Sequence, residues 1–439
     1  MNIGVMMHRR SRLSVCTTLL VFIVVAALYF HNNTASRLHH PGLITTTKND
    51  EIPPGGLYYS QYHLDEFQIS YCGLGILSRA NVTSYITSIL DQKKHHLTKL
   101  NCLNSDFKRY EHLKISAASS KTPYFFALNL RENLAVLPRL LGSIVEVIQF
   151  LGPTNCALSI VEGNSPDGTS DVLAALQAHL DKGLRTHIVL GNKINPLEGS
   201  RFAKLAELRN LALKPILEER ERYSDSTVIF VNDVVICPDD ILELIHQRVH
   251  LGADMTCAMD WVYGSAVPTF YDVYIARGIN GDLFFDVPPD VSWSKATNLF
   301  WNDPESKERF NSNRPVQVFA CWNGAVAFTA KPVATKQVTF RAARENAGEC
   351  YNGEPEIFCK DLWFHGYGKI AVVPYIHLAY TNEAGKRIKD EKGYTSKVVK
   401  RLTSEDAMQW KPPPEKVKCM PSFDRQSWQV WNETLGEHI

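Results

Sequence analysis

The chain lacks several motifs by which common enzyme classes are recognised. It has no G-x-G-x-x-G or Walker-type phosphate loop, no G-x-S-x-G elbow and no H-E-x-x-H zinc motif, so hydrolases and nucleotide-dependent dehydrogenases are disfavoured. It has no C-x-x-C spacing, which disfavours a zinc or thioredoxin-like site. It also lacks an excess of either charge. The 47 basic and 46 acidic side chains leave a net charge of +1, which argues against a nucleic-acid or polyanion binder.

One segment stands out as a long uncharged apolar run. Residues 13–30 contain no charge, and Arg9, Arg10 and Arg12 precede them. A helix of that length spans roughly 27 Å, close to the hydrocarbon core of a bilayer, and the basic flank is expected to stay in the cytoplasm. We therefore expect a single membrane anchor with the rest of the chain in a secretory lumen. A signal peptide cleaved after Ala27 is the alternative.

The cysteines and glycosylation sequons bear on the same compartment. Nine cysteines follow the apolar run, and in an oxidising lumen some should form disulfides, with at least one left over. Short spacing favours two pairs, although connectivity cannot be read from sequence: Cys72–Cys102 and Cys350–Cys359. N-x-S/T sequons begin at three positions: Asn32, Asn81 and Asn432. Asn81 and Asn432 are the candidates for N-glycans, because Asn32 lies close to the expected membrane.

Composition and hydrophobic pattern divide the chain into six parts. We expect a cytoplasmic tail at residues 1–12, the anchor at 13–30 and a flexible stem at 31–56. A stem-proximal helical subdomain is expected at 57–120, the catalytic domain at 121–383 and a peripheral tail at 384–439.

The fold class follows from the part after residue 121, where short apolar runs alternate with amphipathic stretches. Buried strands are expected at 124–128, 156–161, 185–190 and 227–231, with helices at 132–151, 169–183, 200–222 and 238–250. This alternation predicts an α/β fold with a parallel sheet and right-handed crossovers. After a further strand at 255–259, strands near 268–276, 316–329 and 370–378 are expected to be antiparallel and to form an acceptor-side half.

The strongest single site candidate follows strand 227–231. Ligands of open α/β sheets bind beyond the carboxyl ends of the strands, where Asn232 and Asp233 lie. Asp233 is not needed to cap the next helix, which begins near Pro238. A carboxylate at this edge suits Mg²⁺ or Mn²⁺ held against a diphosphate. Asp233 is therefore the candidate metal ligand and Asn232 a candidate contact of a nucleotide sugar, and a plain surface turn is the alternative.

Other polar residues could hold the nucleotide sugar. Glu162 and Asp167 follow strand 156–161, although Asp167 could instead cap the next helix. Arg209 could reach a phosphate as a charge-assisted donor, with Asn210 bonding the neighbouring turn and Arg201 as a second cation. The alternative for this helix is that its charges are only the solvated side of an amphipathic segment.

A last set of residues could line the acceptor side. Asp260 directly follows strand 255–259 and adds a carboxylate to the same edge. Trp322, Asn323 and Gly324 combine an aromatic ring, an amide and a glycine bend, which suits a sugar, and a buried tryptophan in a core turn is the alternative. Asp361 lies in the segment FCKDLW, which ends a loop flanked by acids. Asp260 and Asp361 are the candidate catalytic carboxylates.

Several stretches taken together resemble the fungal capsule-associated α-1,3-mannosyltransferase family of cryptococcal cell-surface biosynthesis. They are VEGNSPDGTSDVL, RFAKLAELRNLAL, VIFVNDVVICPDDILELI, CAMDW, FACWNGAVAF and the GEC…FCKDLW pair, in that order across about 122–381. The resemblance implies a type II Golgi glycosyltransferase of the GT-A fold that uses GDP-mannose with a divalent cation, usually Mn²⁺, and retains the anomeric configuration. It gives Asp233 the position of the D-x-D-type metal carboxylate, but here Asn232 and Val234 flank a single acid.

The expected reaction is transfer of an α-mannosyl group from GDP-mannose to a mannose 3-hydroxyl of a glycan or glycolipid. In a retaining reaction the acceptor can attack from the leaving-group face, so that a diphosphate oxygen takes the proton and no dedicated base is required. Two alternatives stay open. The same fold could use a UDP-sugar such as UDP-xylose, or the chain could be a lumenal carbohydrate-binding protein with a degenerate transferase fold.

Overall fold

The computed structural model describes residues 75–94, 97–103, 107–115, 120–263, 267–288, 295–402 and 407–435. The expected anchor at 13–30, the expected stem at 31–56 and Cys72 lie outside these residues. Within the described ranges, no helix combines the length and the apolar character needed to cross a membrane. Residues 71–439 make one compact unit.

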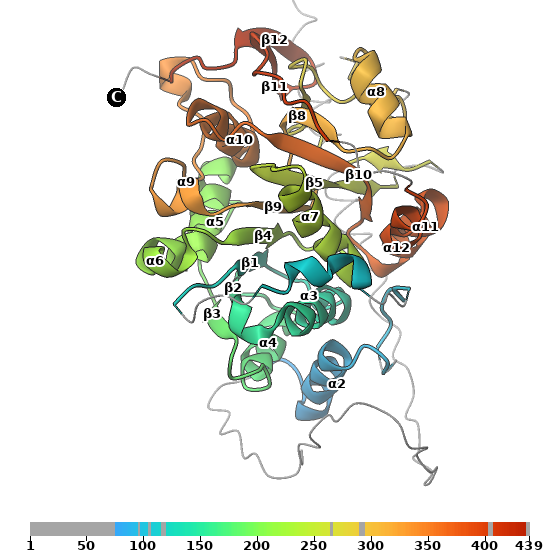
Figure 1. The fold of residues 1–439 in the computed structure, drawn as a ribbon. Coiled ribbons are helices and arrows are strands. Elements are labelled where there is room, and N and C mark those ends of the chain that lie inside the picture. Colours follow the sequence, from blue (N-terminus) through green and yellow to red (C-terminus); the bar gives the residue numbers. More distant parts are fainter. Residues whose placement is uncertain are drawn as a thin grey trace, which may run out of the picture. The chain divides into compact units, whose positions relative to one another are not determined.

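A mixed ten-stranded sheet runs through this unit (Figure 1). Its strands lie in the order β3-β2-β1-β4-β9-β5-β10-β8-β7, and β6 pairs with β5 outside that path. The bounds are β1 (Tyr124–Leu130), β2 (Cys156–Glu162), β3 (Arg185–Val189), β4 (Thr227–Val231), β5 (Met255–Val262), β6 (Thr269–Phe270), β7 (Arg277–Gly278), β8 (Val316–Ala320), β9 (Ala325–Thr329) and β10 (Ile370–Leu378). A separate antiparallel pair joins β11 (Lys416–Ser422) and β12 (Arg425–Val430).

Helices connect and cover these strands. They are α2 (Arg79–Leu90), α3 (Leu137–Leu151), α4 (Thr169–Gln177), α5 (Arg201–Glu218), α6 (Arg220–Tyr223), α7 (Pro238–His250), α8 (Pro304–Asn311), α9 (Lys331–Ala334), α10 (Glu354–Phe364), α11 (Asn382–Lys392) and α12 (Thr395–Val399). Three short 3-10 turns accompany them, at η1 (Lys108–Leu113), η2 (Pro153–Asn155) and η3 (Glu345–Ala347).

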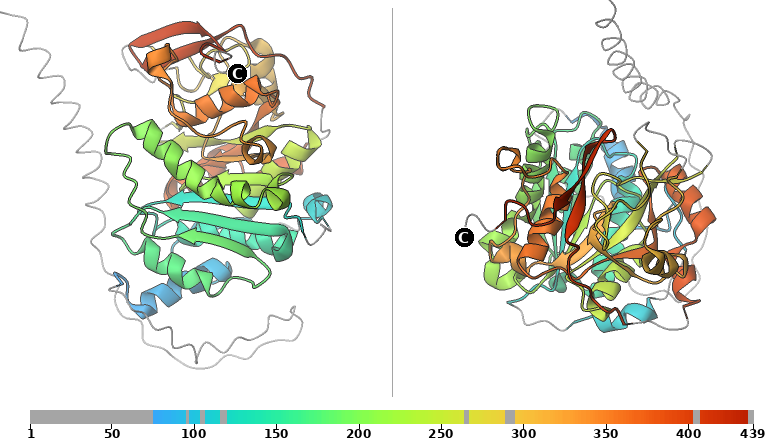
Figure 2. Two further views of the ribbon diagram at one scale, coloured as in Figure 1. Left: turned by 90° about the vertical axis from the view of Figure 1, so that its left-hand side faces the viewer. Right: turned by 90° about the horizontal axis from the view of Figure 1, so that it is seen from above.

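The parallel end of the sheet confirms the predicted α/β pattern. Strands β1, β2, β3 and β4 run parallel. Successive side chains of a strand face opposite sides, so Phe125 of β1 joins the core under α5, while Phe126 joins the core under α3. Figure 2 shows α5 lying across one face of the sheet. The expectation that β3 is buried was wrong, because it is the edge strand and both its terminal residues are exposed.

The second half of the sheet is only partly antiparallel. Strand β9 runs antiparallel to both β4 and β5, and β8 runs antiparallel to β10, as expected. Strand β10, however, runs parallel to β5, so the expectation of antiparallel pairing was wrong there. The reason is that the preceding strand β9 runs antiparallel to β5, and the chain reverses once more before β10, which therefore runs in the same direction as β5.

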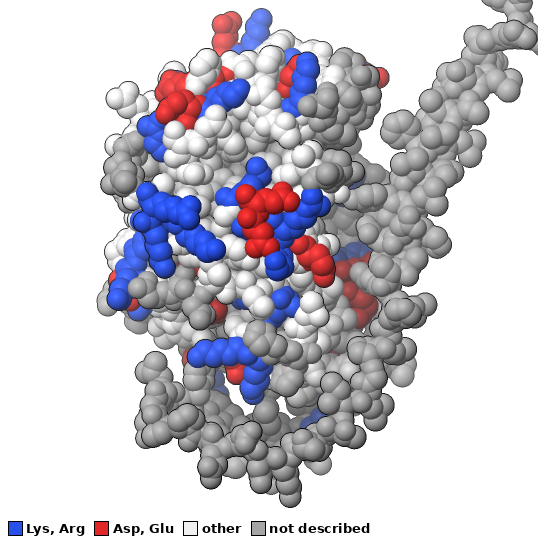
Figure 3. Space-filling view, turned by 90° about the vertical axis from the view of Figure 1, so that its right-hand side faces the viewer, with Lys and Arg blue, Asp and Glu red and all other residues white. Residues whose placement is uncertain are grey.

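The segment after residue 384, expected to be peripheral, contributes to the buried interior. Ile388 and Lys389 of α11 are buried. The Lys389 Nζ lies 2.7 Å from Asp240 Oδ2 on α7, and the Thr395 hydroxyl donates to the other oxygen of Asp240 at 2.6 Å. The outer side of α11 carries i,i+4 pairs such as Arg387–Glu391. On the face shown in Figure 3, groups of Lys and Arg lie beside a group of Asp and Glu, so this face carries no field of one sign.

Both predicted disulfides were wrong. The structure pairs cysteines that lie 64 to 135 residues apart: Cys102–Cys237, Cys257–Cys321 and Cys350–Cys419. Cys359 is buried on α10, where its thiol donates to the Cys321 carbonyl at 3.5 Å, and it is free, as is Cys156. Short sequence spacing was therefore a poor guide, because the sheet brings distant segments closer together than neighbouring ones.

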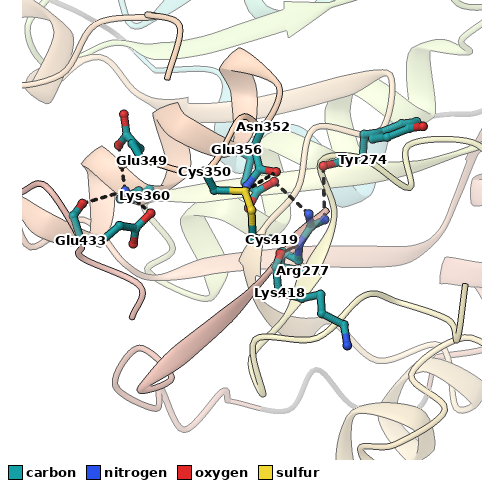
Figure 4. Close-up of a disulfide and its surroundings, with 10 residues drawn as sticks. All are labelled: Tyr274, Arg277, Glu349, Cys350, Asn352, Glu356, Lys360, Lys418, Cys419 and Glu433. Carbon is teal, nitrogen blue, oxygen red and sulfur yellow. Dashed lines mark hydrogen bonds and ion pairs between the residues drawn. A yellow bond between two sulfur atoms is a disulfide. The ribbon is translucent and has the colours of Figure 1, made fainter. Parts of the chain in front are cut away.

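The Cys350–Cys419 bridge joins β11 to the segment before α10, within a group of buried charges (Figure 4). Arg277 lies 3.2 Å from Glu356 and donates through Nε to the Lys418 carbonyl at 2.8 Å. Lys360 Nζ binds Glu349 at 2.7 Å and Glu433 at 3.0 Å. Covalent and ionic contacts therefore hold the carboxy-terminal hairpin to the sheet.

Candidate active site

One edge of the sheet collects most of the polar residues singled out in the sequence. The parallel strands β1, β2, β4, β5 and β10 all end there, and the antiparallel β9 begins there. Ligands of open α/β sheets bind beyond this edge. The segments that reach it are the turn after β4, the turn before β9, the last residues of β5 and the residues that follow β10.

Asp233 lies in the turn after β4, and its neighbours fix that turn. The Asn232 backbone N–H donates to the Gly324 carbonyl at 2.9 Å, and the indole N–H of Trp322 donates to Asn232 Oδ1 at 3.0 Å. Asn133, which follows β1, donates through Nδ2 to Asp233 Oδ2 at 3.3 Å. Burial raises the pKa of Asp233, while its hydrogen bonds and the charge of Arg209 oppose that rise. The turn therefore holds one carboxylate in a fixed position, half-buried at the edge.

A single carboxylate fits one kind of metal site and excludes another. Over the described residues, no group of three or more His, Cys, Asp or Glu side chains could hold a metal ion. A preformed cage of protein ligands is therefore not present there. Mg²⁺ and Mn²⁺ in nucleotide sites are commonly bound through one or two carboxylates and take their other ligands from phosphates and water. Asp233 fits that second arrangement.

The turn before β9 brings the β4 and β5 segments together. Asn323 and Gly324 both have left-handed backbone angles, with φ of 51° and 83°. A Cβ atom on Gly324 would lie 3.1 Å from Val234 Cγ1 and 3.3 Å from Asp260 Cβ. Gly324 therefore lies between Asp260 and Val234, the residue after Asp233. Only glycine suits both the left-handed backbone angle and the small space at this position.

Asp260 is fully buried and belongs to a small acidic group. The Tyr380 hydroxyl, which follows β10, donates to Asp260 Oδ2 at 2.6 Å, and Asp260 Oδ1 has no hydrogen-bond partner. Burial, and then the nearby charge of Asp272, raise the pKa of Asp260 well above its usual value. Burial therefore makes Asp260 harder to ionise than an exposed aspartate.

Asp272 is the site residue that the sequence did not reveal. Its Oδ2 accepts the Asn323 backbone N–H at 2.8 Å and so supports the left-handed turn. Burial raises the pKa of Asp272 to about 6. It follows a strand of only two residues, and nothing in its local pattern distinguishes it from an ordinary loop aspartate.

Arg209 and Asn210 tie α5 to the second half of the sheet. Arg209 Nε lies 2.8 Å from Glu354 Oε1, and its guanidinium lies 4.4 Å from the centre of the Trp322 ring. Asn210 donates to and accepts from the backbone of Phe340 at 2.8 and 3.0 Å. The charge of Arg209 also acts on Asp233, where it lowers the pKa of the carboxyl. Asn210 holds the Phe340 backbone against α5.

The remaining nucleotide-side candidates have different surroundings. Both oxygens of the buried Glu162 accept backbone N–H groups, from Ser165 at 2.6 Å and Gly191 at 2.8 Å, so Glu162 fixes two loops. Asp167 accepts the Thr169 hydroxyl at 2.7 Å and the Leu134 N–H at 3.1 Å. It also accepts the Thr169 backbone N–H at 3.0 Å, but the N-cap of α4 is Gly168, so Asp167 supports the start of this helix without being its cap.

Arg201 is the exception among these nucleotide-side candidates. It is exposed at the first position of α5, and within the described part of the chain it has no ion-pair or hydrogen-bond partner.

Two acceptor-side candidates are enclosed by protein. Trp322 is 1% exposed and packs against Phe230 and Phe340, so the core alternative describes it and its ring offers no surface for a sugar. Asp361 receives two hydrogen bonds from Arg341, at 2.7 and 2.8 Å, and Arg341 also binds Glu349. Asp361 is therefore part of an ion network on α10, and that pairing occupies both of its oxygens.

Comparison with known proteins identifies the family. A family model described as Cryptococcal mannosyltransferase 1 matches residues 123–361. The alpha-1,3-mannosyltransferase CMT1 of Cryptococcus neoformans var. neoformans serotype D is 35% identical over 348 residues, which is 74% of each chain. The chain belongs to this family. It is therefore a glycosyltransferase, and Asp233, Asp260, Asp272 and the Asn323–Gly324 turn all lie inside the matched region.

Two solved structures show a distant likeness to this glycosyltransferase. Residues 1–349 of S. aureus TarS share 15% identity with a TM-score of 0.33, and the match covers 59% of this chain and 60% of that one. The mannosyltransferase PcManGT from Pyrobaculum calidifontis, solved with GDP-Man and Mn²⁺, shares 11% identity with a TM-score of 0.35, over 68% of this chain and 72% of that one.

Proposed function

We propose that this glycosyltransferase transfers an α-mannosyl group from GDP-mannose to a mannose 3-hydroxyl of a glycan or glycolipid, with a GT-A fold, a divalent cation and retention of configuration. The observation that carries the proposal is the lone carboxylate of Asp233, held by Asn133 at the carboxyl end of β4. The α-1,3-mannosyltransferase activity for which the Cryptococcus relative is named supports the sugar and the linkage. The donor nucleotide and the stereochemistry depend on the family resemblance.

Each site residue has a stated task in this proposal. Mn²⁺ or Mg²⁺ held at Asp233 would neutralise the diphosphate as it leaves. Asn133 orients the Asp233 carboxylate, and the nearby charge of Arg209 favours its ionised form. Asp260 is buried and hydrogen-bonded to Tyr380, which suits a reaction in which the leaving diphosphate, and not a side chain, takes the acceptor proton.

The cellular setting belongs to the same proposal. We place the catalytic part in the Golgi lumen, behind a type II anchor at 13–30. The three disulfides support this compartment, because such bonds persist in oxidising environments. Asn81 is exposed on α2 and Asn432 is half-buried, so Asn81 is the more accessible of the two expected glycosylation sites.

The test is a donor and linkage assay on the full-length protein purified in detergent. GDP-mannose, UDP-xylose and other nucleotide sugars are offered with Mn²⁺ and short α-mannosides, and the linkage of any product is determined. Asp233→Asn should lower mannosyl transfer about 1,000-fold, since the cation that would neutralise the leaving diphosphate loses its carboxylate ligand. Its Mn²⁺-dependent binding of GDP, measured by calorimetry, should fall as well. Asp225→Asn, a change at a surface side chain that is 72% exposed, is the matched control.

Each contrary result has a definite meaning. Near-normal turnover by Asp233→Asn would remove this residue from the metal site. Transfer only from a UDP-sugar would replace the donor. Failure of the wild-type protein to bind any nucleoside diphosphate or hydrolyse any donor would favour the carbohydrate-binding alternative.

A further inference from the structure

An exposed tyrosine lies directly beside the buried acidic group. Tyr271 is 52% exposed, although it immediately precedes the inward-pointing Asp272. The pairing of β6 with β5 brings it there, because Phe270 lies opposite Trp261 in the register. The Tyr271 backbone N–H then donates to the Asp260 carbonyl at 3.1 Å. The backbone therefore fixes the position of Tyr271 at the carboxyl end of β5.

The Tyr271 ring packs against Tyr380, a residue of the site. Its centre lies 4.8 Å from that of Tyr380, with the ring planes inclined at 57°. The Tyr380 hydroxyl is the donor to Asp260 at 2.6 Å, and burial raises the pKa of Tyr380 well above its usual value, so it remains a donor. A chain of contacts thus runs from the half-exposed ring through Tyr380 to the Asp260 carboxyl.

An aromatic ring of this kind suits one class of ligand. A tyrosine that is half in solvent offers apolar area next to a polar tip, which is typical of positions that receive a partner. A pyranose ring has an apolar C–H face and hydroxyls at its rim, so it can cover such a ring while its hydroxyls stay near polar groups. Trp322, the aromatic that the sequence suggested for this task, is buried in the core.

We infer that Tyr271 is the platform on which a pyranose ring of the acceptor glycan packs, with Tyr380 as its support. The inference rests on the proposed function, since it names where the acceptor of that reaction binds. Exposed tyrosines are common on protein surfaces. What distinguishes Tyr271 is its attachment, through backbone and ring, to the Asp260 side of the edge where Asp233 also lies.

The same loop offers a matched control. Tyr274 is 40% exposed, lies three residues after Tyr271 and packs on Phe423 at 5.1 Å, away from Tyr380. In Figure 4 it lies beside Arg277, near the Cys350–Cys419 bridge. Tyr271→Ala and Tyr274→Ala therefore remove similar rings from one loop, and only the first removes a ring that contacts the site.

The experiment compares these two variants and Tyr271→Phe in the full-length protein. At saturating GDP-mannose, with α-1,3-mannobiose as acceptor, Tyr271→Ala should raise the acceptor KM about tenfold, the factor expected when one aromatic anchor is truncated. The KM for GDP-mannose and the slow hydrolysis of the donor without acceptor should not change. Tyr271→Phe and Tyr274→Ala should keep the wild-type acceptor KM.

A binding measurement keeps this inference separate from the proposed reaction. Saturation-transfer NMR with mannobiose needs no turnover, so it applies even if the wild-type protein uses another donor. Loss of the mannobiose signal in Tyr271→Ala, with retention in Tyr274→Ala, supports the platform. Equal signals and equal acceptor KM values in both variants, each with a wild-type melting temperature, would overturn it, whatever the donor assay shows.

Discussion

The two ends of the large sheet are stabilised by different kinds of contact. Around β1, β2 and β4, nearly every side chain is buried and apolar, and α3 and α5 cover the two faces with further apolar residues. Around β7, β8 and α10, two disulfides and buried charged side chains such as Arg277 and Lys360 also stabilise the packing. The first end depends on periodic packing between sequence neighbours, and the second on individual contacts between distant segments.

The Arg277 contacts should give the largest difference between the two ends. Arg277→Met removes the buried guanidinium that lies 3.2 Å from Glu356 and donates to the carbonyls of Lys418 and Tyr274, so these buried acceptors lose their partner. We expect a loss of about 3–5 kcal/mol in the free energy of unfolding, measured with urea. Lys121→Met, which removes an exposed partner of Asp225, should cost less than about 0.5 kcal/mol. A cost for Arg277→Met as small as that of the control would contradict the contrast between the ends.

Removal of one disulfide tests whether the ends open separately. Cys350→Ser with Cys419→Ser should cost about 2–4 kcal/mol, because the bridge closes a loop of 69 residues in the unfolded chain. Hydrogen exchange should accelerate in β11, β12 and α10 and stay slow in β1 and β4. Equal acceleration in all of these elements would show that the sheet behaves as one cooperative body.

Two glycines with nearly the same backbone angle allow the cost of backbone strain to be measured apart from the cost of steric contact. Gly324 has φ of 83° and would place a Cβ 3.1 Å from Val234, while Gly348 has φ of 85° with nothing within 4 Å. Gly348→Ala should cost about 1 kcal/mol from strain alone, and Gly324→Ala about 2–3 kcal/mol. Gly324→Ala should also slow sugar transfer, because the Asp233 and Asp260 segments must separate. Equal costs in urea titrations would mean that the contacts at Gly324 relax freely.

A pH dependence of stability also belongs to the second end. Burial raises the pKa of Glu356 to about 8, above the 4.5 of an ordinary glutamate. The folded state then binds the proton more tightly, so stability is lost as pH rises from about 4.5 through 8. Glu356→Gln should remove this loss and exceed the wild type in stability at pH 8, with little difference at pH 5. If the two proteins differed by the same free energy of unfolding at pH 5 and at pH 8, this assignment would be contradicted.

Sequence reasoning succeeded where structure is periodic. Strands β2 and β4 and helix α7 were predicted within a residue of their observed ends, and this placed Asn232 and Asp233 correctly at the sheet edge. Asp260 also lies near this edge, but β5 continues to Val262, so Asp260 lies within the strand and does not follow it as expected.

It failed where a residue's surroundings come from distant parts of the chain. Asp272 follows a strand of two residues and gains its importance from Asn323, 51 positions later. Trp322 has the composition of a sugar platform but is covered by Phe230 and Phe340. The disulfide partners could not be ranked from their spacing in the sequence. Which cysteines meet depends on the order of the strands in the second half of the sheet.

The order of the disulfides along the chain has a consequence for biosynthesis. Among the described cysteines, each bridge is complete before the next one begins: 102 with 237, 257 with 321, and 350 with 419. No bridge encloses or interlaces with another. As the polypeptide is synthesised from its amino terminus, each bond can thus close in turn without waiting for later segments. The competing thiols between partners are Cys156 in the first interval and Cys359 in the last, and both are withdrawn into the interior once their surroundings fold.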